Sequence, residues 1–189
     1  MITKEKWLQV AASIDAFQVF ASLWNTDRAL LERANECYQR YSKLSGVHLF
    51  VKSNMLGFVY LNLVRSIEIL KVSCNKEQLI SLIWSEMMKQ TSVSNWVDLT
   101  SRYQLSLQKF NHKKPEDSKS FYELLKSVRN ALGHMGYRIE GEFVSLVDKN
   151  REGEHFNISI PFNNLLIMAA DFGVCMNNVL MNNNLIVDN

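Results

Sequence analysis

Hydrophobic side chains recur at helical spacing through most of the first 110 residues, which is typical of helices that bury one face. Only two prolines and seven glycines interrupt the whole chain, so long helices can run without a break. The first two helices are expected to form an antiparallel pair. The pattern predicts successive helices over about Lys4–Leu23, residues 26–46, about Ser53–Val72, residues 76–90 and about Ser94–Phe110.

The loop NHKKPED, residues 111–117, interrupts this pattern. Pro115 followed by two acidic residues is typical of a helix start, because proline has no N–H to leave unpaired and the acids face the positive end of the helix dipole. The next helix therefore begins here. It runs to about His134, where Gly133 and Gly136 end it.

Three short runs after this helix, YRI, EFVSLV and FNISI, are rich in β-formers and separated by turn residues. They predict an antiparallel hairpin or three-stranded sheet over about residues 137–160, and Pro161 begins a last helix over about residues 161–182. With the helices within about residues 4–134, this predicts a mainly α fold, an antiparallel helical bundle with a small β insertion before the last helix. A single domain over residues 1–189 is expected, because 189 residues that are 47% hydrophobic can bury a substantial core.

The composition narrows the class of protein without deciding it. A formal net charge of +2 permits contact with nucleic acid but does not require it. Cys37, Cys74 and Cys175 are far apart and lack metal-ligand spacing, so we expect no disulfide framework, no metal and no cofactor. Asp15 interrupts any signal peptide, and the most apolar run is broken by Asn62. We therefore expect a soluble cytoplasmic protein that does not bind a membrane.

The candidate chemistry lies in SVRNALGHMGY, residues 127–137, at the end of the helix that begins near Pro115. At about 100° per residue, Arg129 and His134 diverge by about 140°, and Asn130 also lies off the apolar face. Arginine is long and the helix ends at His134, so the two side chains could still converge on one phosphate. Gly133 leaves room for a ligand or a second subunit. The opposite face should pack in the core through Phe121, Leu124, Leu125, Val128 and Leu132.

These residue types suit RNA cleavage without a metal. Arginine offers a permanent positive fork to phosphate oxygens, and histidine can take and give a proton near neutral pH. A 2′-hydroxyl activated in this way attacks the adjacent phosphate, and Asn130 could orient either partner. The simpler interpretation is a helix end, since glycine is a common C-cap and the helix dipole favours a histidine in the last turn. Spacing alone does not decide between them.

The segment FYELLKSVRNALGHMGYRIEGEFVSLVD resembles the signature helix and hairpin of the HEPN superfamily, the higher eukaryote and prokaryote nucleotide-binding domains. Their motif is an arginine, four to six residues and a histidine, here Arg129, NALG and His134. The resemblance implies a bundle that forms a homodimer, so that two motifs face each other in a composite, metal-independent endoribonuclease site of a phage-defence or toxin system. It implies that His134 is the acid/base group, that Arg129 binds the scissile phosphate and that Asn130 supports both.

The same resemblance leaves a second function open. Some HEPN domains are not catalytic, so the chain could be an inactive interaction module that binds a protein partner, such as an antitoxin or another component of a defence system. The toxin subgroup paired with nucleotidyltransferases usually has tyrosine directly before the histidine, where this chain has Gly133. That subgroup and its antitoxin are therefore not assigned.

Further basic residues are candidates for contact with RNA. Lys126 lies on the motif helix, and His112, Lys113 and Lys114 form a basic loop just before it. A solvated linker is the simpler interpretation of the loop.

Two other features concern the packing around the motif. Arg65 and Glu68 are three positions apart and could form an intrahelical ion pair or a supporting contact to the motif. The tryptophans lie among aliphatic residues and are expected in the core or a dimer surface: Trp7, Trp24, Trp84 and Trp96.

Overall fold

The structure, a computed structural model, describes residues 2–3, 56–71, 75–110, 116–183 and 186–187. The described helices are α4 (Arg65–Lys71), preceded by the π-helical segment η1 (Tyr60–Val64), α5 (Lys76–Thr91), α6 (Trp96–Arg102), α7 (Asp117–Gly133) and α8 (Phe162–Asn182). The strands are β1 (Ile2–Thr3), β2 (Ser106–Phe110), β3 (Tyr137–Glu140), β4 (Phe143–Asn150), β5 (Gly153–Pro161) and β6 (Ile186–Val187). The helices predicted over Lys4–Leu23 and residues 26–46 lie outside the described residues.

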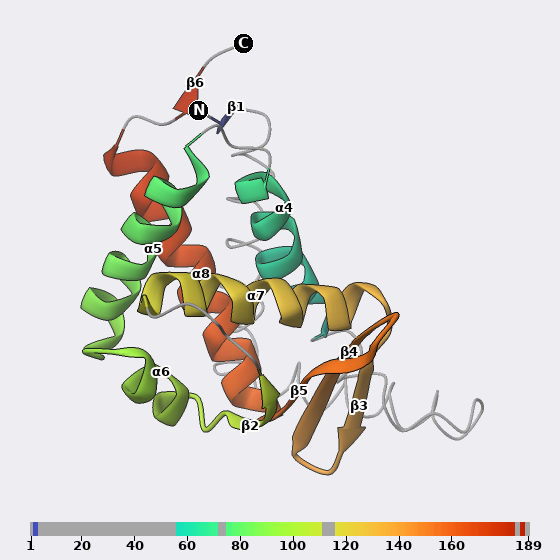
Figure 1. The fold of residues 1–189 in the computed structure, drawn as a ribbon. Helices are drawn as coiled ribbons and strands as arrows, with labels where there is room; N and C mark the ends of the chain where they lie inside the picture. The colour runs from blue at the N-terminus through green and yellow to red at the C-terminus, as the bar shows by residue number, and fades with distance from the viewer. Residues whose placement is uncertain (1, 4–55, 72–74, 111–115, 184–185, 188–189) are drawn as a thin grey trace, which may run out of the picture.

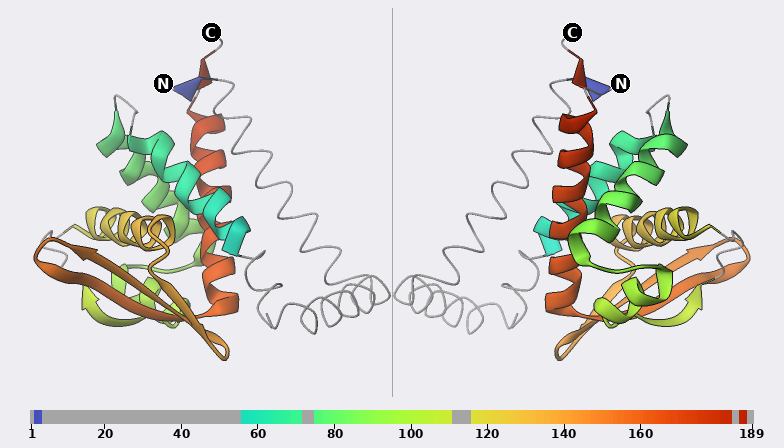
Figure 2. Two further views of the ribbon diagram at one scale, coloured as in Figure 1. Left: turned by 90° about the vertical axis from the view of Figure 1, so that its right-hand side faces the viewer. Right: turned by 90° about the vertical axis from the view of Figure 1, so that its left-hand side faces the viewer.

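The fold is α+β, so the expected mainly α helical bundle with a small insertion is wrong. Four antiparallel strands form a sheet in the order β2-β5-β4-β3. In Figures 1 and 2, α7 lies between this sheet and the helices α4 and α5. The sheet is thus a second layer of the domain, and the protein buries one face of it against helices. Elsewhere, β1 and β6 form a short parallel pair.

The fourth strand comes from the segment that was predicted to be one helix over Ser94–Phe110. The helix α6 ends at Arg102, and Gln104 has a φ of +53°, a left-handed conformation that breaks helical geometry. The next residues form β2, which pairs with β5 although its sequence SLQKF has little β-propensity. The edge of β5 offers N–H and C=O groups that require partners, and β2 supplies them. The strand β2 therefore depends on a segment far away in the sequence.

The face of the sheet that meets α7 is apolar and the opposite face is polar. Val144 and Leu146 of β4 are fully buried, together with Ile158 of β5 beside them. Ser145, which lies between Val144 and Leu146, points to the other face and is half-buried, and Lys149 further along β4 is exposed. This alternation is typical of an antiparallel sheet with one face in the core. The strands β3, β4 and β5 contain the predicted runs YRI, EFVSLV and FNISI, apart from the first residue of the second run.

The predicted core face of the motif helix is confirmed. All five apolar residues named for it are at most 5% exposed: Phe121, Leu124, Leu125, Val128 and Leu132. Trp84 packs on Phe121 with 5.3 Å between ring centroids, and Trp96 is also buried, whereas Trp7 and Trp24 lie outside the described residues.

The long helix α8 runs through the centre of the helical layer. Phe172 on α8 meets Phe121 of α7 edge to face, with 6.2 Å between ring centroids. Among the described residues, α8 alone has the length and apolar composition of a helix that could span a membrane. Core helices meet the same criteria, and α8 buries residues along its whole length against α5 and η1.

A close backbone contact fixes the end of α7 on β4. The Gly136 N–H donates to the Ala131 carbonyl at 2.6 Å, and the Val147 N–H donates to the Gly136 carbonyl at 2.7 Å. A Cβ on Gly136 would lie 2.1 Å from the Val147 carbonyl oxygen, so only glycine fits. His134, two residues earlier, is therefore held beside β4.

A buried tyrosine joins α6 to α8. The Tyr103 hydroxyl donates to Asp171 Oδ2 at 2.8 Å, and Asn164 Nδ2 donates to the Tyr103 carbonyl at 3.1 Å. Arg102 lies 3.5 Å from the same carboxylate oxygen. Burial, and then the hydrogen bond to the anionic Asp171, raises the pKa of Tyr103.

We predict that Gly136→Ala lowers the free energy of unfolding by about 3 kcal/mol, because its Cβ would meet a backbone oxygen that cannot swing away. Gly133→Ala is the matched control, because nothing lies within 4 Å of a Cβ there. This control should be neutral or more stable by up to about 1 kcal/mol, since alanine is the better helix former. Chemical denaturation measures both variants. Equal unfolding midpoints would contradict the close packing of α7 on β4.

We predict that Tyr103→Phe costs about 1.5–3 kcal/mol at neutral pH, because a buried hydrogen bond to a charged acceptor is lost. The pKa of Tyr103 is raised in the native protein, so the unfolded chain loses this proton at a lower pH. The contribution of the Tyr103 hydroxyl to the free energy of unfolding is therefore complete below about pH 10 and declines as the pH rises above it. Urea denaturation at a series of pH values from neutral to beyond about pH 10 should show that the free energy of unfolding falls more steeply with pH for the parent protein than for Tyr103→Phe. An equal fall in both proteins would refute this.

Candidate active site at the end of α7

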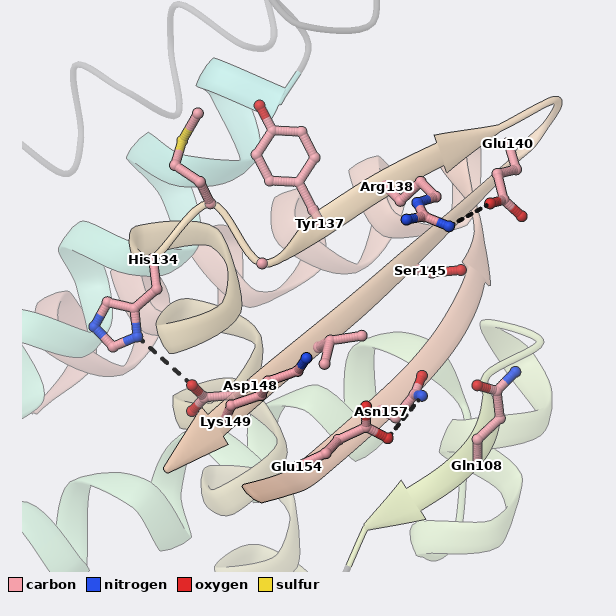
Figure 3. A pocket seen from close by; sticks show the side chains of 13 residues that line it. Gln108, His134, Tyr137, Arg138, Glu140, Ser145, Asp148, Lys149, Glu154 and Asn157 are labelled. Carbon is pink, nitrogen blue, oxygen red and sulfur yellow. Dashed lines mark hydrogen bonds and ion pairs between the residues drawn. The ribbon is translucent and has the colours of Figure 1, made fainter. Parts of the chain in front are cut away.

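His134 lies at the C-cap of α7, and its side chain is 68% exposed. Its backbone N–H donates to the Asn130 carbonyl at 2.9 Å, so the last helical turn fixes the position of its backbone. The imidazole Nδ1 lies 3.6 Å from Asp148 Oδ1 on β4, as Figure 3 shows. This is an ion-pair distance and is slightly too long for a hydrogen bond.

Asp148 is a buried carboxylate between two imidazoles. Only 4% of Asp148 is exposed, and its second oxygen, Oδ2, lies 3.2 Å from His155 Nε2. Burying a carboxylate is expensive unless hydrogen-bond donors meet it, and an imidazole N–H can do so from each side. The result is a His134–Asp148–His155 cluster that joins the helix end to two strands.

A β-bulge directs His155 toward Asp148. In the pairing of β4 with β5, Asp148 faces Phe156 whereas Lys149 faces Glu154, so His155 is the extra residue. A bulge of this kind interrupts the strict alternation of side chains and redirects one of them. The Nδ1 atom of His155 is buried and has no hydrogen-bond partner among the described residues.

Sequence reasoning missed both Asp148 and His155. One signal was available for Asp148, because Val144, Leu146 and Asp148 share the buried face of a strand and the third of them is an acid. His155 carried no such signal, since the position of a bulge depends on strand register.

A groove of about 530 Å³ opens beside His134 on the polar face of the sheet. His134, Asp148 and Lys149 lie at one end of it, and Figure 3 shows the ion pair between Arg138 and Glu140 toward the other end. Ser145, Asn157 and Gln108 line it from three different strands. His134 therefore lies at the edge of a space that a small polar ligand or one nucleotide of a chain can enter.

The structure places Arg129 and Asn130 elsewhere. Arg129 Nη1 donates to Asn130 Oδ1 at 2.8 Å, and Nη2 forms an ion pair with Glu68 of α4. Within the described chain, no hydrogen bond or ion pair joins Arg129 to His134, and Arg129 does not line the groove. Glu68 therefore makes the supporting contact to the motif that the sequence allowed for it. Glu68 also pairs with Lys71 at 3.4 Å.

Lys126 belongs to a different surface. Its ammonium pairs with Glu123 at 2.5 Å, and it lines a second cavity of about 360 Å³ between α7 and the helices α4 and α5. The structure therefore does not bring Lys126 to His134. The loop residues His112, Lys113 and Lys114 lie outside the described residues.

Comparison with protein families, with curated proteins and with solved structures returned no match for this chain. In the described part of the chain, no group of three or more histidine, cysteine or acidic side chains is arranged to hold a metal ion. An exposed imidazole backed by a buried carboxylate is an arrangement for moving a proton.

Proposed function

We propose that this protein is a metal-independent endoribonuclease in which His134 is the acid/base group and Asp148 orients it. The observation that supports this is the position of the exposed imidazole at the edge of a groove, with Nδ1 facing a buried carboxylate. When Asp148 holds the Nδ1–H of the neutral ring, Nε2 is free to accept a proton.

In the proposed reaction, Nε2 of His134 accepts the proton of the 2′-hydroxyl, and the 2′-oxygen attacks the adjacent phosphorus. The bond from phosphorus to the 5′-oxygen breaks, and this oxygen leaves with the proton that His134 has taken up from the 2′-hydroxyl. The products are a 2′,3′-cyclic phosphate and a 5′-hydroxyl. Negative charge builds on the phosphate oxygens, where a guanidinium would stabilise it.

Arg129 would supply that guanidinium from a second copy of the chain. In one chain Arg129 is held by Glu68 and is not joined to His134. The resemblance to the HEPN superfamily implies a homodimer with a composite site, which would bring Arg129 of one chain to the phosphate at His134 of its partner. Met135, next to His134, is 73% exposed, as expected for a side chain that a partner covers. A cytoplasmic role in phage defence or as a toxin is part of this proposal.

A second candidate function is an inactive interaction module that binds a protein partner. The observation that favours it is the pairing of Arg129 with Glu68 and Asn130, which occupies the guanidinium inside one chain. In this case Arg129 would have a structural role in joining α7 to α4.

We predict that the purified protein cleaves single-stranded RNA in the presence of EDTA and leaves cyclic phosphate ends. His134→Ala should abolish cleavage, and Asp148→Asn should reduce kcat about 10²–10⁴-fold, because the imidazole loses the group that selects its tautomer. Lys119→Ala, at an exposed position on the same helix, is the control and should retain full activity. Loss of activity with EDTA, or full activity of His134→Ala, would count against the nuclease.

We also predict that Glu68→Gln lowers the KM for RNA several-fold, since Arg129 would no longer be neutralised by a carboxylate. Glu152→Gln, an equal change of charge in the exposed turn between β4 and β5, should change KM much less. Steady-state cleavage kinetics of both variants measure this. A purely structural ion pair predicts instead lower stability for Glu68→Gln with an unchanged KM.

A further inference from the structure

The groove beside His134 continues over the sheet beyond the groups that the proposed reaction uses. Lys149, Asn157 and Gln108 line it from β4, β5 and β2. We propose that this groove binds one nucleotide of single-stranded RNA, with its phosphate at Lys149 and its base at Asn157 and Gln108. This inference rests on the proposed function, because the bound nucleotide is the neighbour of the bond at His134.

The charged side chains of the groove differ in whether another side chain of the protein already pairs with them. Arg138 pairs with Glu140 at 3.5 Å, and Glu154 accepts a hydrogen bond from Asn157 Nδ2 at 3.0 Å. Lys149 makes no ion pair or side-chain hydrogen bond to any described residue, although it follows Asp148 directly in the chain. An unpaired ammonium next to the His134–Asp148 end is where a phosphate of a strand lying on His134 would be received.

The neutral groups of the groove suit a base. A carboxamide both donates and accepts hydrogen bonds, as the edges of nucleobases do, and this is how asparagine and glutamine recognise bases. Glu154 fixes the Asn157 amide by accepting from Nδ2, which leaves Oδ1 and one N–H for a ligand. Gln108 lies at an irregularity in the pairing of β2 with β5, between Leu107 and Lys109, which is a site where a strand can redirect a side chain.

The size and charge of the groove favour a single strand. A volume of about 530 Å³ accommodates about one nucleotide but not a duplex. Arg138 and Lys149 are balanced by Glu140 and Glu154, so no positive track follows the groove. Affinity should therefore come from hydrogen bonds and one phosphate contact, and the slope of log K against log salt should be about −0.7, the value for one contact with a single strand.

The test is NMR titration of the full chain with uncleavable 2′-O-methyl RNA trinucleotides, each made of one base type. We expect amide shifts at Gln108, Lys149 and Asn157, and unequal affinities for the four base types. Lys149→Ala should weaken binding about tenfold and remove the salt dependence. Asn157→Ala and Gln108→Ala should make the four affinities more similar. Lys89→Ala, which removes an exposed lysine that does not line the groove, is the control.

Two outcomes would overturn the inference: groove variants that bind as tightly as Lys89→Ala, or shifts confined to the surface around Arg129 and Glu68. Its failure is distinguishable from failure of the nuclease. Cleavage that persists unchanged in the groove variants would leave the nuclease standing and reject the groove. RNA binding that Lys149→Ala and Asn157→Ala weaken in a protein without cleavage activity would support the groove and reject the nuclease.

Discussion

The close approach of Gly136 to Val147 is the constraint on which the site depends. The Gly136 N–H donates to the Ala131 carbonyl of α7 at 2.6 Å, and the Val147 N–H of β4 donates to the Gly136 carbonyl at 2.7 Å. The separation between Gly136 and Val147 leaves no room for a side chain at residue 136. The apolar face of the sheet can therefore pack directly on α7. The same contact holds His134 against Asp148, so helix packing and site geometry have one common cause.

The features that the sequence predicted well are those determined by local spacing. The buried face of α7 follows from helical periodicity, and β3, β4 and β5 follow from short alternating runs between turns. The strand β2 could not be predicted in this way, because it depends on the open edge of β5, about fifty positions away in the sequence. Asp148 and His155 were missed for the same reason, since register and a bulge bring them together.

The correction from a bundle to a two-layer fold changes how the motif must be understood. In a bundle, the outer side of the motif helix would have no wall until a partner covered it. In the α+β fold, β4 and β5 supply a wall for His134 within the same chain, whereas Arg129 on the other side of α7 meets α4. Because Arg129 and His134 diverge by about 140° around the helix, they contact different elements. Under the proposed function a second chain would bring Arg129 to the imidazole, whereas the elements that place the imidazole belong to one chain.

The two histidines of the cluster are not equivalent, and this difference bears on function. His155 lies 3.2 Å from Asp148 and is partly buried, so its Nε2–H can serve as a hydrogen-bond donor to the buried carboxylate. His134 is 3.6 Å away and mostly exposed, where water could satisfy its ring equally well. The contact between His134 and Asp148 therefore contributes little to stability itself, and the packing of α7 on β4 is what places the two side chains together. Hydrogen bonds of a catalytic base are often long in the absence of a substrate and shorten when one binds, so the 3.6 Å separation is compatible with the role proposed for His134.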